Sequence, residues 1–362
     1  MSRLYFDHNA DAPVLDQAWQ AYQAGAALVG NPSSTHHFGR EASEALAHAE
    51  HSLKESIGAE GYTLCWTSGG TEADAMVLAG SGLEAQLVGA AEHAAVLENA
   101  PKADAIAMNS EGLYVLESIS PVNQERLVCI SLANSETGVI QPVAEVVRQL
   151  RANGPVWVHC DGVQAAGRIA LNITELDVDS FALAAHKFGG VPGVGALLLK
   201  PGRRLSPTLL GGGQQSGQRP GTLQVAGPMS LIAALKAWTP EQRETLRSLR
   251  DKLEADALEV PGIEVVGGNS LRLPNTTSLR VSGCSGDALL MALDVEKISI
   301  STGSACSSGA IEPSKTLLAM GMTEEEAGQV IRVSLGFDQT YAEVEAFITA
   351  FKDVVRRARS FG

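Results

Sequence analysis

An apolar segment that ends in histidine and lysine is the first feature of this sequence that could do chemistry. Residues 180–184 read Ser-Phe-Ala-Leu-Ala, and Ala185, His186 and Lys187 follow directly, before Phe188 and two glycines. Burying an ammonium group is costly, so a lysine at the end of a buried strand is unusual. The position is reasonable if the Lys187 amine forms a Schiff base. An exposed loop lysine is the alternative.

A carboxylate at the end of a second apolar run is the next candidate. Residues Val156–Cys160 are typical of a buried strand, and Asp161 follows them at the edge where α/β sheets place their ligands. This carboxylate could pair with the protonated ring nitrogen of a cofactor. Capping of the following turn by Asp161 is an equally good interpretation of the segment alone.

A phosphate-binding turn is a third candidate, at residues 67–73, which read Thr-Ser-Gly-Gly-Thr-Glu-Ala. The turn follows an apolar strand and opens a helical stretch, whose first N–H groups are free to bind an anion. The alternative is an ordinary helix start with Thr71 as the N-cap. The glycine spacing matches neither a P-loop nor the dinucleotide fingerprint, so those nucleotide motifs are excluded.

One cysteine lies among small residues, in the segment 301–310 with the sequence Ser-Thr-Gly-Ser-Ala-Cys-Ser-Ser-Gly-Ala. Cys65, Cys129 and Cys160 lie in apolar strands and are interpreted as packing residues, while Cys284 has no assignment. Cys306 has no apolar neighbourhood, and we interpret it as an exposed, mobile nucleophile. A loop cysteine of no consequence is the alternative.

Two single residues add weaker signals. His93 follows a strand and could do acid–base work or stack on a ring, although a lone histidine is more often structural. Arg332 is a charge inside the apolar run Val330–Ser334. A buried guanidinium needs a partner, and a substrate carboxylate is one candidate.

The composition limits the class of protein. The net charge of −14 over 362 residues argues against nucleic-acid binding, which needs a basic footprint. The five cysteines form no C-x-x-C pair, and no histidine spacing predicts a metal site. The N-terminus lacks the apolar core of a signal peptide, and no apolar run reaches the about 18 residues of a membrane span. We expect a cytoplasmic protein with free thiols and no membrane partner.

Alternating strands and helices must position these residues. The predicted strands are Tyr62–Thr67, Gln86–Gly89, Leu127–Leu132, Val156–Cys160, Ser180–Ala184 and Ala196–Leu199, and the predicted helices between them are Arg40–Ile57, Thr71–Leu78, Val143–Asn153 and Ile173–Leu176. This alternation indicates an α/β domain with a largely parallel, buried sheet.

After Gly227 the pattern changes to that of a smaller α+β domain. Its predicted elements are helices at Pro228–Trp238, Glu241–Leu258, Asp287–Leu293 and Tyr341–Arg359, with strands at Ile263–Val266, Thr277–Val281 and Val330–Ser334. A long helix near residues 228–258 would connect the two domains.

Taken together, a phosphate turn, an Asp for a ring nitrogen, a Schiff-base lysine and a histidine describe a pyridoxal phosphate site. At these residues the chain resembles the cysteine desulfurases of the class V aminotransferase-like group. The matching segments are Tyr5–Ala10, Gly30–Ser34, Thr67–Ala73, Glu92-His93, Asn134–Pro142, His159–Gln164, His186-Lys187, Gly211–Thr222, Gly303–Ser308 and Arg332–Gly336.

The resemblance implies a homodimer of fold type I, an α/β transferase fold that depends on pyridoxal phosphate. A large domain at 16–240 would hold a mostly parallel, seven-stranded sheet and the cofactor. A smaller α+β domain, formed by 1–15 and 241–362, would carry the catalytic cysteine loop.

The resemblance also implies a role for each site residue. Lys187 would hold the cofactor covalently, Asp161 would pair with its ring nitrogen, and His93 would stack on the ring and transfer protons. The other implied cofactor contacts are Gly70, Thr71, Ser135, Gln164 and His186, with Thr222 supplied by the other subunit. Arg332 and Asn31 would bind the substrate, and Cys306 would accept its sulfur.

The implied reaction converts L-cysteine to L-alanine and leaves a persulfide on Cys306, for delivery to an iron–sulfur scaffold or another acceptor protein. Ser135 and Ala184 depart from the family pattern, which has an amide and a serine there, and the glycine-rich stretch around Ser216 lacks one basic residue that the family usually has. Two alternatives therefore stay open at this point. One is a pyridoxal phosphate lyase or transaminase acting on another amino acid, such as selenocysteine or cystine, and the other is a degenerate, non-catalytic relative.

Overall fold

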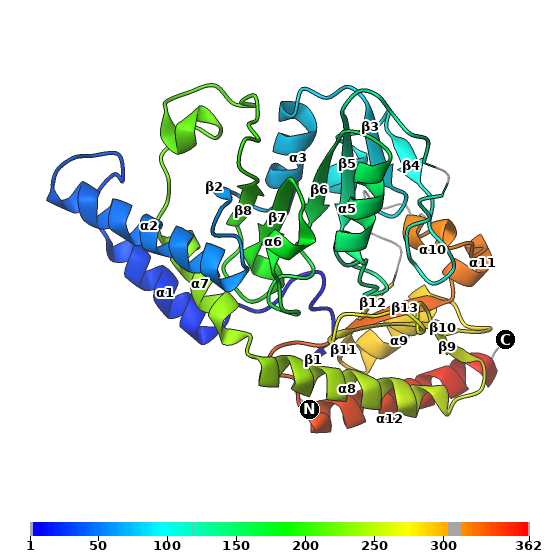
Figure 1. Ribbon diagram of the computed structural model, residues 1–362. Coiled ribbons are helices and arrows are strands. Elements are labelled where there is room, and N and C mark those ends of the chain that lie inside the picture. The colour runs from blue at the N-terminus through cyan, green and yellow to red at the C-terminus, as the bar shows by residue number, and fades with distance from the viewer. Residues whose placement is uncertain (1–2, 118, 303–312, 361–362) are drawn as a thin grey trace.

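The computed structural model describes residues 3–117, 119–302 and 313–360, which form a seven-stranded, a four-stranded and a two-stranded sheet with helices around them (Figure 1). Across the largest sheet the strands are, in order, β2 (Thr63–Thr67), β8 (Gly195–Leu199), β7 (Ser180–Ala184), β6 (Val156–Asp161), β5 (Arg126–Ser131), β3 (Gln86–Gly89) and β4 (Asp104–Ile106). β8 runs antiparallel to both of its neighbours, and the other pairs are parallel. The expected mostly parallel, seven-stranded sheet is confirmed.

This sheet is buried on both faces because side chains alternate along each strand. Val128 and Ile130 of β5 belong to the same hydrophobic core as Val146 of α5 (Val143–Ala152). Cys129, between them in sequence, belongs to a second core with Met76 of α3 (Gly70–Gly80). Burial on both faces explains why the strands are continuous apolar runs rather than alternating ones.

Three helices form a layer on the left-hand side of Figure 1. They are α1 (Asp16–Ala27), α2 (His37–Ser56) and α7 (Ala226–Ala237), and α7 packs against both of the others. Two single-turn helices, α4 (Ala94–Leu97) and α6 (Ile173–Leu176), and the 3-10 turns η1 (Ala185–Lys187) and η2 (Gln214–Gly217) complete this part of the chain.

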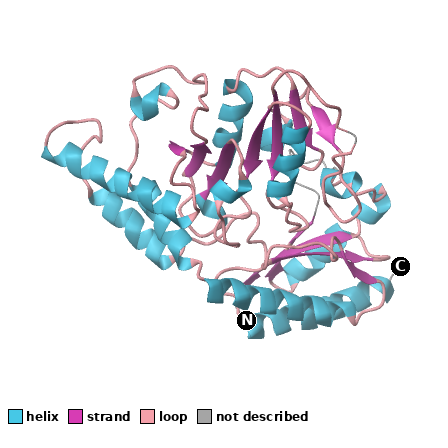
Figure 2. Cartoon of the chain, viewed as in Figure 1, coloured by secondary structure: helices cyan, strands magenta, loops and turns pink. Residues whose placement is uncertain are grey.

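The four-stranded sheet lies below the large one in Figure 2. It is antiparallel, in the order β12 (Ser301–Thr302), β13 (Val330–Ser334), β10 (Thr276–Val281) and β9 (Ile263–Val265). The helices around it are α8 (Pro240–Leu258), α9 (Gly286–Val295), α10 (Lys315–Ala319), α11 (Glu324–Ala327) and α12 (Tyr341–Ser360). The α+β character expected after Gly227 is confirmed.

The N-terminal segment joins this second region. β1 (Leu4–Tyr5) pairs in parallel with β11 (Ile298–Ser299), and Asp7 forms a bridge with Ser334 at the end of β13. The segment then continues along the large sheet, where the Ala12 N–H donates to the His186 carbonyl. Residues near both sheets are thereby tied together by the first dozen residues of the chain.

The helices predicted at Pro228–Trp238 and Glu241–Leu258 are confirmed to within two residues at each end, while the long connection expected near residues 228–258 is interrupted between them. The chain forms two helices, α7 and α8, which are separated at Trp238 and Thr239. Pro240 cannot supply a helical N–H, and the Thr239 side chain instead caps α8 by accepting from the Gln242 N–H. The break turns the chain between the two helices, in place of a straight connection.

Several elements were not expected from the sequence. The longest is α1, whose sequence Asp-Gln-Ala-Trp-Gln-Ala-Tyr-Gln-Ala-Gly-Ala-Ala has a weak apolar periodicity. The others are β1, β4, β11, β12, α4, α10 and α11, each of five residues or fewer. A pattern of that length carries too few positions to distinguish a strand from a loop.

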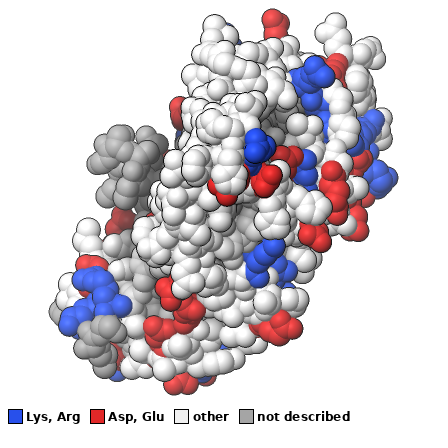
Figure 3. All heavy atoms as spheres, turned by 90° about the vertical axis from the view of Figure 1, so that its left-hand side faces the viewer, with Lys and Arg blue, Asp and Glu red and all other residues white. Residues whose placement is uncertain are grey.

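The surface carries mixed charge on the face drawn in Figure 3, where lysine and arginine are interspersed with aspartate and glutamate and form no continuous basic stripe. Among the described helices, none combines the length and apolarity needed to cross a membrane.

Candidate active site

A cavity of about 130 Å³ opens at the carboxyl ends of the parallel strands β5, β6 and β7, beside the N-terminus of α3. This edge of an α/β sheet is where ligands bind, because loops and helix N-termini converge there. Eight of the predicted cofactor residues line it: Gly70, Thr71, His93, Ser135, Asp161, Gln164, His186 and Lys187. The sequence segments that carry them are spread over more than a hundred residues, and the sheet brings them together.

Asp161 lies at the end of β6 and is half-buried at the edge of the sheet. Its Oδ1 accepts from the Val163 N–H at 2.8 Å. Burial, followed by the nearby Asp74 carboxylate, raises the pKa of Asp161 to about 7. A cationic N–H in the cavity would restore the ionised form of this group, so the site fits a protonated pyridine nitrogen. Asp161 can cap the next turn and bind a ring nitrogen at the same time, because Oδ1 accepts from the Val163 N–H and Oδ2 does not.

Lys187 ends the 3-10 turn η1 that follows β7. Its Nζ donates to the carbonyls of Asn9 at 2.8 Å and Ala10 at 2.6 Å. Burial, followed by the positive charge of Arg168, lowers the pKa of Lys187 to about 8. A larger fraction of this amine is therefore neutral at neutral pH than for an exposed lysine, as formation of a Schiff base requires.

The N-terminus of α3 forms one wall of the cavity. Gly69, not Thr71, occupies the N-cap position, so the interpretation of Thr71 as the N-cap is wrong. Thr71 is the second residue of the helix, and it lines the cavity beside Gly70. A Cβ on Gly70 would lie 2.6 Å from Val163 Cγ2, so the backbone here approaches the neighbouring loop too closely for a side chain. The first N–H groups of a helix have no acceptor within the helix, so the N-terminus of α3 suits a phosphate.

His93 and Gln164 face the same cavity from two loops. His93 caps α4 by accepting from the Ala95 N–H through Nδ1 at 3.0 Å, which leaves Nε2 as the free end of the ring. The Gln164 side chain donates through Nε2 to the Asn9 carbonyl at 3.1 Å, and its Oε1 accepts from Arg168. Both side chains are thus held in a single orientation toward the cavity.

Arg332 lies on β13, outside the residues that line this cavity, but next to them. Its guanidinium donates to Asp7 Oδ1 at 2.6 Å and to the Ser135 carbonyl at 3.1 Å. Its Nε is buried and has no partner in the described part of the chain. The expectation that Arg332 needs a partner is met within the protein by Asp7 and the Ser135 carbonyl.

Two further predicted residues are not brought to the cavity, and a third lies outside the described residues. The exposed Asn31 side chain accepts from the Ser33 N–H in its own turn, and Thr222 lines a different cavity behind β2, with Ser68 and Arg219. Cys306 lies outside the described residues, and so do all of Gly303–Ser308. The predicted roles of these three residues remain predictions.

Sequence reasoning missed several buried residues behind the cavity wall. Ser131 and Asn134 line it, and Asn134 Oδ1 accepts from the N–H groups of Glu136 and Thr137, both at 2.9 Å. Arg168 lies beneath it, fully buried. The available signal was position, because residues that directly follow a buried strand lie at this edge whatever their type.

A further missed group is the carboxyl of Glu92, which lies between Tyr114 and Ser131. It accepts from the Ser131 N–H at 3.0 Å and also bonds the hydroxyls of Tyr114 and Ser131. Burial raises the pKa of Glu92 to about 8, so the group is protonated at neutral pH. It adjoins His93 in sequence and supports the cavity wall from behind.

The four described cysteines are buried and free. The interpretation of Cys65, Cys129 and Cys160 as packing residues in strands is confirmed, and Cys284 belongs to the same core as Ile263. Burial raises the pKa of Cys65 to about 12, which makes it a poor nucleophile. Among the described residues there is also no cluster of His, Cys, Asp and Glu suited to a metal ion.

The seven-stranded sheet, together with a lysine, a half-buried aspartate and a helix N-terminus around one cavity, defines the class of pyridoxal phosphate enzymes of fold type I. The residues fit this cofactor, since Lys187 can hold it, Asp161 can pair with its ring nitrogen and the N-terminus of α3 can bind its phosphate.

Comparison with known proteins identifies the family. Residues 4–347 match the Aminotransferase class-V family. The cysteine desulfurase of Cereibacter sphaeroides is 35% identical, over 99% of this chain and 97% of that protein. Cysteine desulfurase IscS of Dictyoglomus turgidum is 31% identical, over 99% and 95%. This chain belongs to the aminotransferase class-V family, whose members depend on pyridoxal phosphate.

Solved structures agree with this assignment. The NifS-like protein of Rickettsia africae superposes with a TM-score of 0.89 at 30% identity, covering 98% of this chain and 99% of that one. A second NifS-like protein gives a TM-score of 0.90 at 29% identity, covering 98% and 100%. The likeness extends over nearly the whole chain.

Proposed function

We propose that this protein is a pyridoxal phosphate-dependent cysteine desulfurase. The reaction takes L-cysteine and the Cys306 thiol to L-alanine and a Cys306 persulfide, so that atoms and electrons balance without an added oxidant. The observation that carries the proposal is the convergence of Lys187, Asp161 and the N-terminus of α3 on one cavity, in a chain whose curated relatives are named cysteine desulfurases.

Pyridoxal phosphate, when bound, supplies an electron sink for the substrate carbon next to the amine. Lys187 Nζ holds the cofactor and, when released, removes and returns the proton at that carbon, a role that suits its lowered pKa. Asp161 keeps the proton on the ring nitrogen. His93 stacks on the ring and moves protons through its free Nε2.

Substrate binding and sulfur transfer are assigned to other elements. Arg332 binds the substrate carboxylate, using the guanidinium that Asp7 orients from one side. The Cys306 thiolate attacks the substrate sulfur, and the bond from that sulfur to carbon breaks as alanine forms. Thr71 and His186 bind the cofactor phosphate, and Ser135 provides a short wall where the family has an amide.

The proposal extends to the surroundings of the enzyme. It acts as a cytoplasmic homodimer, in which Thr222 reaches the partner's cofactor phosphate. The large domain comprises 16–240, and the small domain comprises 1–15 and 241–362. The sulfur passes from Cys306 to an acceptor protein, such as an iron–sulfur scaffold.

The decisive experiment compares Cys306→Ala with the unchanged protein. After incubation with L-cysteine and cofactor, we expect one added sulfur on the Cys306 peptide by mass spectrometry, together with stoichiometric alanine. In Cys306→Ala we expect the Schiff-base absorbance to persist while alanine formation falls at least about a hundredfold, since no nucleophile receives the sulfur.

The matched control is Cys284→Ala, which removes a buried thiol of the second region and should leave alanine formation unchanged. Undiminished sulfide release by Cys306→Ala would contradict the persulfide route and favour a lyase. Absence of Schiff-base absorbance in the unchanged protein, even with excess cofactor, would contradict catalysis altogether.

A further inference from the structure

Arg168 is a fully buried cation directly behind the site, and the mechanism above does not use it. The residue is 1% exposed. Burial lowers the pKa of Arg168 to about 9, which still leaves the guanidinium charged at neutral pH. It forms no ion pair in the described part of the chain. An unpaired buried charge is unfavourable for folding, so a guanidinium at this position indicates a role beyond stability.

The hydrogen bonds of Arg168 all end on the active-site frame. Nη2 donates to the His8 carbonyl at 2.9 Å and to the Lys187 carbonyl at 2.8 Å. Nη1 donates to the Gln164 carbonyl at 3.3 Å and to Gln164 Oε1. The planar fork thus joins three segments that are distant from one another in sequence: the N-terminal segment, the turn after β6 and the turn after β7.

The bond to Gln164 Oε1 decides which way the amide faces. Because the oxygen accepts from Arg168, the nitrogen must point away from it, and one of its two hydrogens donates to the Asn9 carbonyl. The second hydrogen is then available to an acceptor in the cavity. The same Asn9 carbonyl accepts from Lys187 Nζ, so Arg168, Gln164 and Lys187 share one network.

The charge of Arg168 acts on the same amine. It is the strongest of the nearby charges that lower the pKa of Lys187, after burial itself. The other charged groups facing this amine are Arg332, which acts in the same direction, and Asp11 and Asp161, which oppose it. Arg168 also contributes to lowering the pKa of His8 to about 4, again after burial.

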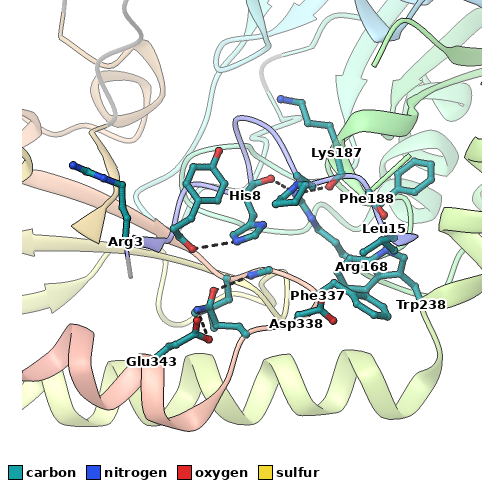
Figure 4. Close-up of a pocket in the computed structure, with 17 residues that line it drawn as sticks. Arg3, His8, Leu15, Arg168, Lys187, Phe188, Trp238, Phe337, Asp338 and Glu343 are labelled. Atoms are coloured by element: carbon teal, nitrogen blue, oxygen red, sulfur yellow. Dashed lines mark hydrogen bonds between the residues drawn. The ribbon is translucent and has the colours of Figure 1, made fainter. Parts of the chain in front are cut away.

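Figure 4 shows Arg168 and its neighbours around a second cavity. Arg168 and Lys187 both contribute to this cavity of about 210 Å³, which lies on the opposite side of the lysine backbone and has an apolar floor that includes Leu15, Phe188 and Trp238. The Lys187 side chain points away from this cavity, and the Arg168 guanidinium lies between His8 and Lys187.

We propose that Arg168 is a positioning residue for the proposed reaction: its fork holds the Lys187 backbone and turns the Gln164 amide toward the cavity, and its buried charge disfavours a second positive charge on the Lys187 amine. The inference rests on the proposed function, which gives Lys187 its role. The residue touches neither substrate nor cofactor, and it acts through the two side chains that do.

The test measures the Lys187 amine in the cofactor-free protein, so it does not depend on desulfurase activity. Trace acetic anhydride labels neutral amines only, and mass spectrometry of the Lys187 peptide across pH gives the midpoint of its titration. The exposed Lys102 is the internal standard. In the unchanged protein we expect the Lys187 midpoint below that of Lys102.

Arg168→Gln removes the charge and keeps an amide donor, so the Lys187 midpoint should rise by about one pH unit. Arg168→Lys keeps the charge, so its midpoint should stay close to that of the unchanged protein. If Arg168→Gln fails to fold, Gln164→Glu gives Arg168 a carboxylate partner at constant volume, and the midpoint should rise in that variant as well.

The role of Arg168 in orienting the Gln164 amide is tested separately, by cofactor affinity and absorbance. Arg168→Lys retains the charge but not the fork, so we expect weaker pyridoxal phosphate binding and a shifted absorbance maximum of the bound cofactor, with the amine midpoint unchanged. Midpoints for Arg168→Gln and Gln164→Glu that both equal that of the unchanged protein would overturn the charge role. Unaltered cofactor affinity and spectrum in Arg168→Lys would overturn the orientation role.

Discussion

At the scale of single residues, this site depends on groups whose protonation is set by burial. Asp161 and Lys187 lie around one cavity, with a pKa of about 7 and about 8, and each is shifted toward its neutral form. A cofactor with a cationic ring nitrogen would stabilise the ionised Asp161 carboxylate, and its aldehyde would react with the neutral Lys187 amine. The unusual lysine at a strand end, noted from sequence, has its explanation here.

Glu92 permits a prediction at this scale. Its carboxyl has a pKa of about 8 in the folded protein against 4.5 for an ordinary glutamate. Its contribution to stability is therefore fully present below about pH 4.5 and is lost as the pH rises to about 8. Glu92→Gln removes this titration. We expect the stability advantage of the unchanged protein over this variant to shrink by about 3–4 kcal/mol between pH 5 and pH 8.

Urea unfolding of the cofactor-free protein at each pH measures this change. Glu84→Gln is the control, because Glu84 is exposed and should show no such trend. A constant difference between the unchanged protein and Glu92→Gln across the range would show that Glu92 is ionised at neutral pH.

At the scale of elements, the site is made by strand ends meeting a helix start. β8 runs against its neighbours, and its first residue, Gly195, packs on the turn that begins α3. A Cβ there would lie 2.6 Å from the Leu183 carbonyl oxygen and 2.7 Å from Gly69 Cα. Both atoms belong to the backbone, so neither can move aside without shifting its strand or helix. This close contact therefore positions the N-terminus of α3.

Gly195→Ala should therefore push α3 away from β8. We expect a loss of stability of about 1–3 kcal/mol from overpacking, together with weaker cofactor binding, because the phosphate-binding N–H groups move. Thermal unfolding and fluorescence titration with pyridoxal phosphate measure the two effects. Gly61→Ala is the control, since a Cβ there meets nothing within 4 Å. Wild-type affinity in Gly195→Ala would contradict the placement argument.

At the scale of the whole molecule, one chain leaves Thr222 away from its own cofactor cavity. The loop between β8 and α7 carries this residue and also exposes Leu209 and Leu210, with Leu210 92% exposed. Apolar side chains at this exposure favour burial in an interface. The proposed homodimer accounts for both observations, because the partner would cover the leucines and receive Thr222.

Sedimentation equilibrium should give twice the mass of one chain. Leu210→Asp should shift the protein toward the monomer and weaken cofactor binding at the same time, since Thr222 would lose its position in the partner. Leu271→Asp is the control, because Leu271 is 80% exposed on a loop of the second region. A monomer in the unchanged protein, with full cofactor affinity, would contradict the proposal.

The sequence predicted the large sheet well because its strands are buried on both faces and therefore read as uninterrupted apolar runs. Predicted and observed strands differ by one residue at most at each end, as for Val156–Asp161. It predicted poorly where local signals were short or mixed. The two-residue strand β12 has no periodicity, and the weak apolar periodicity of α1 gave no helix prediction.

The site residues divide in the same way. Local sequence alone pointed to Lys187, Asp161 and the turn before α3, because each is a polar or glycine-rich interruption directly after an apolar strand. It could not reveal Arg168, Glu92 or the Asp7–Arg332 pair. The partners of these residues lie between 4 and 325 positions away along the chain, and only folding creates the burial that shifts their protonation.

The sequence by itself thus determined the sheet, the reactive residue types and the resemblance to one enzyme family, since these follow from local periodicity and from short motifs. The tertiary structure decided which of those residues share a cavity and how a buried cation joins three separate segments. It also decided which amine and which carboxyls have a pKa shifted toward neutral pH. These properties depend on burial and on distances between distant parts of the chain, and no stretch of sequence contains them.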